Sequence, residues 1–249
     1  MLTDAQLIEI EIATLWKRDA RGRLTRDAER HGRPAPHFVI AVANDGQRVA
    51  IGSDVPDALA VQLRAAIDES SHSSDSSTPP AALAKCRQLL EPVAGSLELS
   101  SGPSYWIPLA TRYASEAVIV RSDGRGIEPL RRLPPDGWRP DEWRDLIDGA
   151  LGPWAAAVEG DQVVALCHSA RLTDRGAEAG VWTAPGHRGK GLAAAVTAAW
   201  SALFDRDERH LFYSTSADNA SSQNVALRLN LRPIGWMWKL SSPANAASS

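Results

Sequence analysis

Hydrophobic and polar positions in the first half of the chain follow both helical and alternating patterns. Apolar residues at helical spacing predict three helices, and alternating or continuous apolar runs predict four strands. The helices are expected over residues 4–19, 57–70 and 81–92, and the strands over 37–43, 48–51, 96–109 and 116–121. Asn44-Asp45-Gly46 predicts a hairpin turn between the first two strands, and the Ser- and Pro-rich residues 70–80 predict a loop. The first half is therefore expected to be a mixed α/β region.

The second half of the chain has a denser pattern of strands and helices. Helices are expected over 139–149, 192–203 and 219–229, and strands over 154–158, 162–169, 178–183, 210–216 and 234–240. Glu159-Gly160-Asp161 predicts a second hairpin turn, between the first two of these strands. The expected order is therefore hairpin, strand, helix, strand, helix, strand.

The connection between the strand at 178–183 and the helix that follows is rich in glycine and positive charge. It contains Arg188-Gly189-Lys190-Gly191-Leu192-Ala193. The first N–H groups of a helix have no carbonyl partner within the helix, and the helix dipole adds positive potential there. The glycines leave room for close approach, and Arg188 and Lys190 add charge. Residues 188–193 therefore predict a phosphate-binding cradle, with a tight solvated turn as the alternative.

Two nucleotide-binding motifs can be compared with this segment. A nucleoside-triphosphate P-loop requires Gly at the position of Ala184 and Ser or Thr at the position of Gly191, so that motif is excluded. The dinucleotide pattern fits Gly189-x-Gly191-x-x-Ala194, with Asp218 as its acidic residue. In that fold, however, the first strand runs directly into the first glycine, whereas here several residues intervene.

Residues 154–240 resemble the GNAT superfamily of acyl-CoA N-acyltransferases. The Arg/Gln-x-x-Gly-x-Gly/Ala motif of that family follows a strand, and Arg188, Gly191 and Ala193 meet it here. The downstream Asn-x-x-Ser motif appears as Asn219-Ala220-Ser221-Ser222, and a Leu-Gly-Phe-like turn appears as Leu229-Asn230-Leu231. Two motifs in this order are more specific than either one alone.

The resemblance implies an α/β (α+β) fold with a GNAT-like mixed, mostly antiparallel sheet. Its central strands would be splayed and flanked by helices. The GNAT-like acyl-CoA-binding catalytic domain is expected over residues 126–249. Residues 1–125 are then a smaller N-terminal mixed α/β accessory region, with a degenerate copy of the same fold as the alternative.

The resemblance also implies how acetyl-CoA, as co-substrate, would bind. Its pyrophosphate would lie on the N–H groups of residues 188–193, and its pantetheine arm would pair with the backbone of residues 181–183. Asn219 would hydrogen-bond the pantetheine or cysteamine part, with Ser222 one turn further along. The expected binding residues are Val181, Trp182, Thr183, Arg188, Gly189, Lys190, Gly191, Leu192, Ala193, Asn219 and Ser222.

Proton transfer is the second requirement of this chemistry. An amine is mostly protonated at neutral pH, so direct attack needs a base. Glu178 is the first candidate for this base and His168 the second. The family commonly uses a tyrosine as the acid, three residues before the Leu of its turn, where this chain has Ala226. Tyr213 is the candidate for a relocated acid.

The implied activity is transfer of an acetyl group from acetyl-CoA to an unidentified primary amine on a small molecule or peptide. Because the usual acid is missing, a non-catalytic CoA-binding or regulatory protein is the alternative. A dinucleotide-binding domain is the second alternative.

Composition narrows the expected partners and location. The chain has 27 Lys and Arg against 30 Asp and Glu, with no basic block, which argues against a nucleic-acid partner. Cys86 and Cys167 are expected to be buried thiols, and no close His/Cys cluster predicts a metal site. Glu9 and Glu11 argue against a signal peptide, and no apolar run predicts a membrane span. A soluble cytoplasmic protein is expected, and a homodimer stays open.

Overall fold

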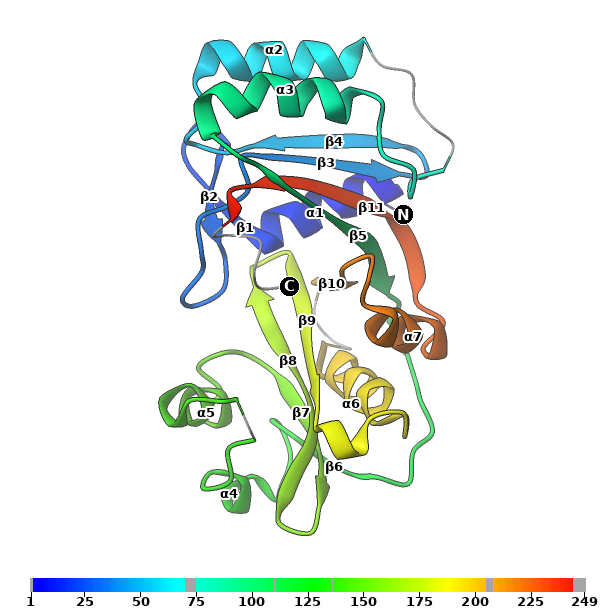
Figure 1. Cartoon of the computed structure of the whole chain (residues 1–249). Helices are drawn as coiled ribbons and strands as arrows, with labels where there is room; N and C mark the ends of the chain where they lie inside the picture. Colours follow the sequence, from blue (N-terminus) through cyan, green and yellow to red (C-terminus); the bar gives the residue numbers. More distant parts are fainter. Residues whose placement is uncertain (1, 70–74, 110, 136, 205–207, 244–249) are drawn as a thin grey trace. The chain divides into compact units, whose positions relative to one another are not determined.

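The chain forms two compact units, each assembled from segments that are not consecutive (Figure 1). The computed structural model describes residues 2–69, 75–109, 111–135, 137–204 and 208–243. Unit 1 comprises Met1–Tyr105, Ser214–Ala220 and Pro233–Ser249, and unit 2 comprises Trp106–Tyr213 and Ser221–Arg232. The chain therefore passes from unit 1 to unit 2 after Tyr105, and it returns to unit 1 twice, at Ser214 and at Pro233. The domain division at residue 125 stays a prediction.

Unit 1 is built around four strands in the order β4-β3-β11-β5. Their bounds are Gly46–Ile51 for β4, Phe38–Ala43 for β3, Arg232–Ser241 for β11 and Glu98–Ile107 for β5. β3 is antiparallel to β4, its hairpin partner, and to β11, where Phe38 lies opposite Leu240. Two short strands, β1 (Trp16–Arg18) and β2 (Leu24–Asp27), pair separately.

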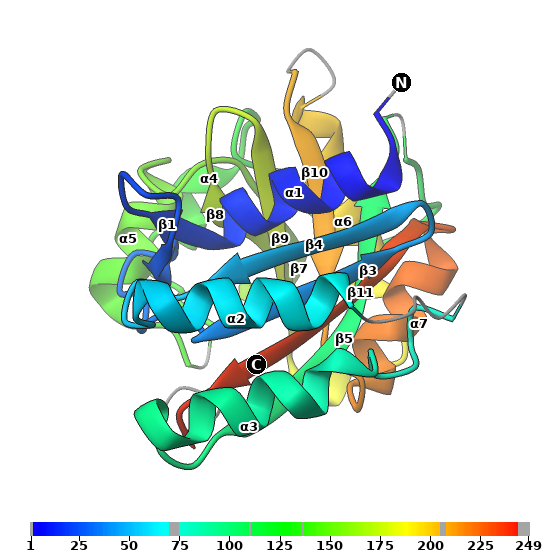
Figure 2. The same cartoon turned by 90° about the horizontal axis from the view of Figure 1, so that it is seen from above.

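Helices cover both faces of β3, and all six of its residues are buried. Unit 1 includes the helices α1 (Asp4–Leu15), α2 (Asp57–Asp68) and α3 (Ala82–Ala94). Phe38 and Ile40 belong to a core that includes apolar residues of α2, α3 and β11. The helices α2 and α3 lie side by side over the strands, and α1 packs against β3 and β4 (Figure 2).

The described residues of unit 2 contain five strands, in the order β10-β9-β8-β7-β6. Their bounds are His210–Ser214 for β10, Gly176–Thr183 for β9, Gln162–Leu172 for β8, Trp154–Glu159 for β7 and Val118–Arg121 for β6. The strands from β6 to β9 pair antiparallel with their neighbours, whereas β9 and β10 are parallel. A parallel pair needs a crossover connection, and the helix α6 (Leu192–Ser201) provides it.

Helices also pack on the sheet of unit 2. The helix α6 packs against β7, β8 and β9. The helices α4 (Ile127–Leu130) and α5 (Pro140–Ile147) contribute to a separate core that contains Trp143 and Trp154. The indole Nε1–H of Trp143 donates to the carbonyl of Leu130 at 2.8 Å and so ties α5 to α4. The helix α7 (Ala220–Arg228) follows β10 along the chain.

The predicted fold class is confirmed: the strands are mostly antiparallel and helices flank them. The first helix ends at Leu15, earlier than the predicted residue 19, because Trp16 is extended and pairs with Asp27. The short elements β1, β2 and α4 were not predicted, since three or four residues carry too little periodicity. Residues 70–74 of the predicted loop lie outside the described residues.

Two further predictions concern the cysteines and a membrane span. Cys86 and Cys167 are both buried thiols. Burial raises the pKa of Cys86 to about 11 and also raises the pKa of Cys167. None of the helices in the described ranges combines the length and the apolar character needed to cross a bilayer.

Candidate functional site

The cradle predicted at residues 188–193 lies between the end of β9 and the start of α6. A short 3-10 helix, Pro185–His187, connects them. Its His187 N–H donates to the carbonyl of Ala184 at 2.9 Å, and its imidazole lies 2.8 Å from the Glu159 carboxylate at the β7–β8 turn. These contacts fix the path of the chain from the strand into the cradle.

Both glycines of the cradle have left-handed backbone conformations. Gly189 has a φ of 80° and Gly191 a φ of 81°, a region that costs a residue with a side chain about 1–2 kcal/mol. A Cβ on Gly189 would meet nothing within 4 Å, whereas a Cβ on Gly191 would lie 2.6 Å from the hydroxyl of Tyr113. Glycine is thus required at both positions by the backbone, and at Gly191 also by a neighbouring side chain.

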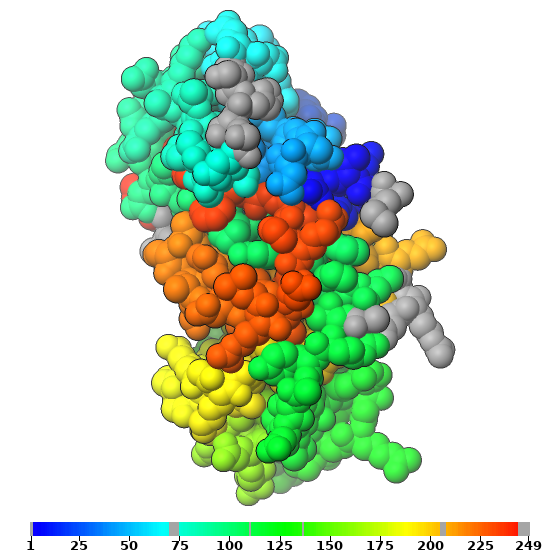
Figure 3. Space-filling view, turned by 90° about the vertical axis from the view of Figure 1, so that its right-hand side faces the viewer, coloured from blue at the N-terminus to red at the C-terminus, as the bar shows by residue number. Residues whose placement is uncertain are grey.

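The start of α6 presents N–H groups and positive charge. Gly191 is the N-cap, and its carbonyl accepts the N–H of Ala195 at 3.1 Å, so the N–H groups of residues 192–194 have no carbonyl one turn before them. Arg188 and Lys190 are exposed. Arg228, at the end of α7, places both Nη atoms 3.5 Å from the carbonyl oxygen of Gly189. The yellow cradle segment is visible on the surface in Figure 3.

The parallel strands β9 and β10 separate before the cradle. Their pairing covers residues 176–178 of β9, and the last pair is Glu178 with Phe212. β9 continues as a strand to Thr183 and stays paired with β8 on its other side, through Leu166↔Trp182 and Ala165↔Thr183. The edge of residues 181–183 that faces away from β8 is therefore not covered by β10. This is the splay predicted from the resemblance.

The first base candidate and the acid candidate lie where this pairing ends. Glu178 is the last paired residue of β9, and Tyr213 is the first residue of β10 beyond the pairing. Both are buried, with exposed fractions of 2% and 3%. Burial is the main cause that raises the pKa of the Cys167 thiol, and the Glu178 carboxylate adds to the increase. The carboxylate thus lies in the interior of unit 2, beside the point of separation.

The second base candidate, His168, is packed against the strands. A Cβ on Gly180 would lie 2.5 Å from His168 Cε1, so glycine at that position leaves room for the ring. The ring also meets Trp138 edge to face, with 5.1 Å between centroids. Burial lowers the pKa of His168 to about 4, the Gly180 backbone hydrogen bond opposes this, and Arg171 adds to the decrease. The imidazole is therefore neutral at neutral pH and a weak base.

The downstream motif begins immediately before α7. Asn219 is half-buried, and its N–H donates to the carbonyl of Ser216 at 3.1 Å. Asn219 belongs to unit 1, whereas Ser222 belongs to unit 2 together with the cradle. Ala226, at the position of the usual tyrosine, is buried and offers no proton.

The Leu-Asn-Leu turn ends α7 with the two hydrogen bonds of a Schellman motif. The N–H of Leu231 donates to the carbonyl of Ala226 at 2.9 Å, and that of Asn230 to Leu227 at 3.0 Å. Asn230 has a φ of 49°, the left-handed conformation that glycine adopts most readily and that asparagine tolerates. The turn therefore ends α7 with asparagine in the conformation that glycine most often supplies.

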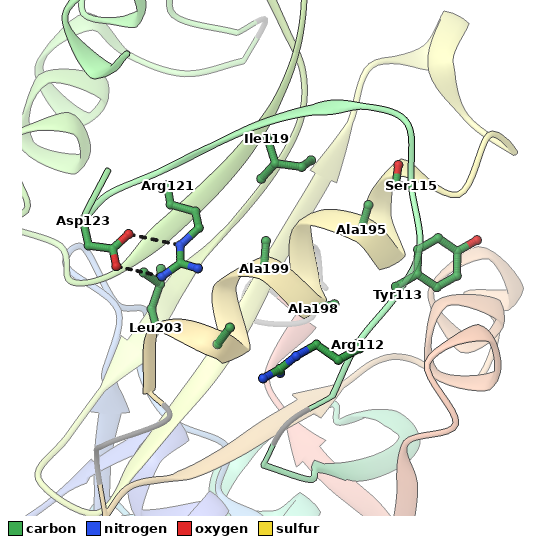
Figure 4. A pocket seen from close by; sticks show the side chains of 11 residues that line it. Arg112, Tyr113, Ser115, Ile119, Arg121, Asp123, Ala195, Ala198, Ala199 and Leu203 are labelled. Atoms are coloured by element: carbon green, nitrogen blue, oxygen red, sulfur yellow. Dashed lines mark hydrogen bonds and ion pairs between the residues drawn. The ribbon is translucent and has the colours of Figure 1, made fainter. Parts of the chain in front are cut away.

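A cleft of about 680 Å³ lies beside the cradle helix (Figure 4). One wall comes from residues 112–123, and the other is the alanine-rich face of α6. Arg121 and Asp123 form a two-bond ion pair in it, at 2.7 and 3.0 Å. The lining residues are Arg112, Tyr113, Ser115, Ile119, Arg121, Asp123, Ala195, Ala198, Ala199, Ala202 and Leu203. The cleft thus combines hydroxyl and guanidinium groups with an apolar wall that runs along α6 and past its last residue, Ser201.

Sequence patterns did not indicate two residues of this site, Tyr113 and Arg228. Tyr113 lies in an irregular segment that precedes β6, and Arg228 is one exposed arginine at a helix end. Neither belongs to a motif, so only the folded chain reveals their positions beside Gly191 and Gly189. In the described part of the chain, no three His, Cys, Asp or Glu residues are grouped to hold a metal ion.

The sequence around the cradle is similar to a known protein family. Residues 143–233 match the family model of GNAT acetyltransferase. The matched range contains the cradle, the separating strands β9 and β10, and α7. No curated protein matches the chain.

Solved structures align with the chain at low identity. A GCN5-related N-acetyltransferase from Kribbella flavida aligns over 98% of this chain and 96% of its own, with 15% identity and a TM-score of 0.49. A GCN5-related N-acetyltransferase-like protein from Streptococcus suis aligns over 83% and 84%, with 18% identity and a TM-score of 0.44. A GNAT-family protein from Novosphingobium aromaticivorans has 20% identity and a TM-score of 0.43, and the alignment covers 57% of this chain but only 64% of that protein.

With TM-scores below 0.5 and identities of 20% or less, these likenesses say nothing about the substrate of this chain. The family model matches residues 143–233, and this match supports acyl transfer as their general chemistry. The match over residues 143–233 confirms the resemblance of the second half of the chain to the GNAT superfamily.

Proposed function

We propose that this chain is an N-acetyltransferase that transfers an acetyl group from acetyl-CoA to a primary amine by direct attack. The observation that carries the proposal is the path of β9. Its pairing with β10 ends at Glu178, and the strand then runs to Thr183 and into the cradle with an edge that β10 does not cover. A pantetheine arm can pair with such an edge while the phosphates lie on the helix N-terminus.

The residues of the cradle fit an oligophosphate. Gly191 lets the Tyr113 hydroxyl lie against the helix start, and the N–H groups of residues 192–194 point out of the helix end. Arg188, Lys190 and Arg228 supply positive charge around them. The hydroxyl of Tyr113 lies close enough to the helix start to donate a further hydrogen bond.

The reaction needs an acceptor amine that has lost its proton. Acetyl-CoA, when bound, supplies the thioester carbonyl that the amine attacks. Glu178, at the end of the β9–β10 pairing, is proposed to accept the ammonium proton, directly or through water. An N–H group on the uncovered edge of β9 is proposed to stabilise the developing oxyanion. Tyr213 is proposed to protonate the departing thiolate in place of the tyrosine that Ala226 replaces.

The decisive experiment is a thiol-release assay with purified protein, acetyl-CoA and a panel of small-molecule and peptide amines. Amine-dependent release of free CoA, with the acetylated amine identified by mass spectrometry, is the expected result. If acetyl-CoA binds but no amine or peptide releases the thiol, the catalytic proposal fails. The acceptor is expected to be a small molecule or peptide, and the reaction is expected to take place in the cytoplasm.

One observation favours a second candidate, a non-catalytic CoA-binding or regulatory protein. Ala226 is buried in α7 at the position where the family commonly has its acid. A protein that kept the cradle and lost the acid would bind CoA without turnover. Calorimetry with CoA, alongside the thiol-release assay, separates the two candidates. Binding of a nicotinamide dinucleotide and not of CoA would contradict both.

A further inference from the structure

Three polar residues from separate segments of unit 1 meet at the ends of β3, β4 and β11. His37 directly precedes β3, Asp54 lies in the turn after β4, and Ser242 directly follows β11. The Nδ1 atom of His37 lies 2.6 Å from Oδ2 of Asp54. The Nε2 atom of the same ring lies 2.8 Å from Oγ of Ser242. The imidazole thus bridges a carboxylate and a hydroxyl through its two different nitrogens.

Backbone hydrogen bonds hold the histidine in place. The N–H of His37 donates to the carbonyl of Leu240 at 3.0 Å, and its carbonyl accepts the N–H of Gly52 at 2.8 Å. The His37 residue is 8% exposed, so the surrounding structure restricts the orientation of its ring. A Cβ on Gly52 would lie 2.5 Å from Oδ1 of Asp54 and 3.1 Å from Cα of His37, so glycine there makes room for the pair.

The turn that carries Asp54 is also held on both sides. The N–H of Ser53 donates to the carbonyl of Leu24 at 2.7 Å, and that of Val55 donates to Gly52 at 3.2 Å. The Val55 side chain is buried in the core of unit 1. The Asp54 side chain itself is 57% exposed, and Ser242 is half-buried, so solvent reaches both ends of the arrangement.

Charge determines the direction of the two hydrogen bonds. The hydrogen bond from His37 is the largest cause that lowers the pKa of Asp54, so this carboxylate is ionised at neutral pH. An ionised carboxylate only accepts, and Nδ1 of His37 must therefore carry the proton. In the neutral ring Nε2 is then an acceptor, and the Ser242 hydroxyl donates to it. This is the arrangement in which histidine acts as a base toward a serine.

We propose that Ser242, His37 and Asp54 form a nucleophilic triad that hydrolyses small acyl esters, independently of the cradle in unit 2. The Oγ of Ser242 attacks the ester carbonyl while its proton passes to Nε2 of His37. The bond to the leaving alcohol breaks, and His37 returns the proton to that alcohol, which leaves an acyl-serine. Water, deprotonated by the same nitrogen, then releases the acid and restores Ser242.

The expected rate is modest. A missing oxyanion donor costs about 10²–10³-fold in turnover in serine hydrolases, and no such donor is assigned to Ser242. Activated esters need less oxyanion stabilisation than ordinary ones, because their leaving group departs easily. The suitable probes are therefore p-nitrophenyl acetate for turnover and a fluorophosphonate for covalent labelling of the serine.

The test uses the full-length protein and four variants. Ser242→Ala and Asp54→Asn are expected to lower the hydrolysis of p-nitrophenyl acetate on the order of tenfold or more. Mass spectrometry after fluorophosphonate treatment is expected to place the label on Ser242 in the wild type, and Asp54→Asn is expected to slow the labelling. The matched controls are Ser53→Ala and Asp57→Asn. Ser53 is a half-buried serine and Asp57 an exposed aspartate of the same unit.

Melting temperatures of all variants separate reactivity from structure. If the three residues only tie the segments together, the variants lose stability, but Ser242 of the folded wild type takes no label. Absence of labelling on wild-type Ser242 therefore overturns the proposal, as does hydrolysis by Ser242→Ala or Asp54→Asn at the wild-type rate. A failure to bind CoA would contradict the proposed function but not this proposal, because the triad lies in unit 1 and the cradle in unit 2.

Discussion

The hydroxyl of Tyr113 occupies the space where a side chain on Gly191 would begin. An ideal Cβ on Gly191 would lie 2.6 Å from Tyr113 Oη and 3.4 Å from Cε1 and Cζ of the ring. Gly191 also has a φ of 81° at the N-cap of α6. Two independent constraints, one from the backbone and one from a contact, therefore require glycine at the start of the proposed phosphate site.

The three glycines of this connection allow these constraints to be measured separately. Gly191→Ala introduces both left-handed backbone strain and a clash with Tyr113. Gly189→Ala introduces the backbone strain alone, and Gly186→Ala introduces neither. The loss of stability on urea unfolding is expected to be about 1–2 kcal/mol for Gly189→Ala, larger for Gly191→Ala and near zero for Gly186→Ala. Equal losses of stability for Gly191→Ala and Gly189→Ala would show that the Tyr113 side chain can move away from the added methyl group without destabilising the fold.

Binding of acetyl-CoA is expected to depend on Gly191 and not on Gly186. Gly191→Asp adds a side chain and a negative charge to the cradle, and calorimetry is expected to show no binding of acetyl-CoA. Gly186→Ala is the control and is expected to bind as the wild type does. Unchanged affinity of Gly191→Asp would place the pyrophosphate elsewhere.

Tyr113 provides the next prediction. Tyr113→Phe keeps the ring and removes the hydroxyl beside the helix start, so the melting temperature is expected to change little. Loss of one hydrogen bond to a charged phosphate is expected to weaken acetyl-CoA binding by about tenfold, which corresponds to about 1.4 kcal/mol. Tyr105→Phe, a tyrosine of unit 1, is the control. If both variants bind equally well, Tyr113 is only a steric neighbour of Gly191.

The sequence was most informative where the structure depends on neighbouring residues. The cradle could be predicted because a strand, two glycines and a helix start follow one another along the chain. The hairpin at Asn44-Asp45-Gly46 could be predicted for the same reason. Asn230 stands in the terminal turn of α7 where the family motif has glycine. Its own residue type explains this, since asparagine tolerates the left-handed conformation.

Relationships between distant segments could not be predicted from patterns. Tyr113 reaches Gly191 across the fold of unit 2, and no periodicity marks it. His37 and Ser242 are separated by 205 positions, and only the antiparallel pairing of β3 with β11 brings them together. The burial of His168 depends on Trp138 and Gly180, so its pKa could not be inferred from residue type.

Glu178 is the subject of the main catalytic prediction. Glu178→Gln keeps the size and hydrogen bonding of this buried side chain and removes its basicity. If it is the general base, turnover is expected to fall on the order of a hundredfold or more. Glu128→Gln changes a carboxylate of the same unit that is 82% exposed and is expected to leave turnover unchanged.

The acid candidate is tested in the same assay. Tyr213→Phe is expected to cost less than Glu178→Gln, because a thiolate can leave with the help of water. Loss of nearly all activity in Tyr213→Phe, with CoA still bound, would show that water cannot replace this acid and that Tyr213 matters as much as Glu178. Wild-type turnover in Glu178→Gln would mean that the base lies elsewhere, and His168 is then the next residue to test.

His168 leads to a prediction about stability and pH. Its pKa is about 4 in the folded protein, below its ordinary value of 6.5. Between these two values the unfolded chain binds more protons at this residue than the folded chain does, so the free energy of unfolding rises with pH. The contribution is fully present above pH 6.5 and is lost as the pH falls toward 4. Its full size is about 3 kcal/mol, at 1.36 kcal/mol for each unit of pKa.

The measurement is urea unfolding at a series of pH values from about 4.5 to 7, a window set by the shift of this residue. His168→Gln is the test variant, because its amide can still donate to the carbonyl of Gly180 and it does not titrate. The wild type is expected to lose more stability than the variant as the pH falls, by up to about 1.36 kcal/mol per pH unit. His187→Gln, at a histidine on the rim of the cradle, is the control for histidine replacement. Parallel curves for the wild type and His168→Gln would show that the imidazole titrates normally, which would restore it as a base candidate.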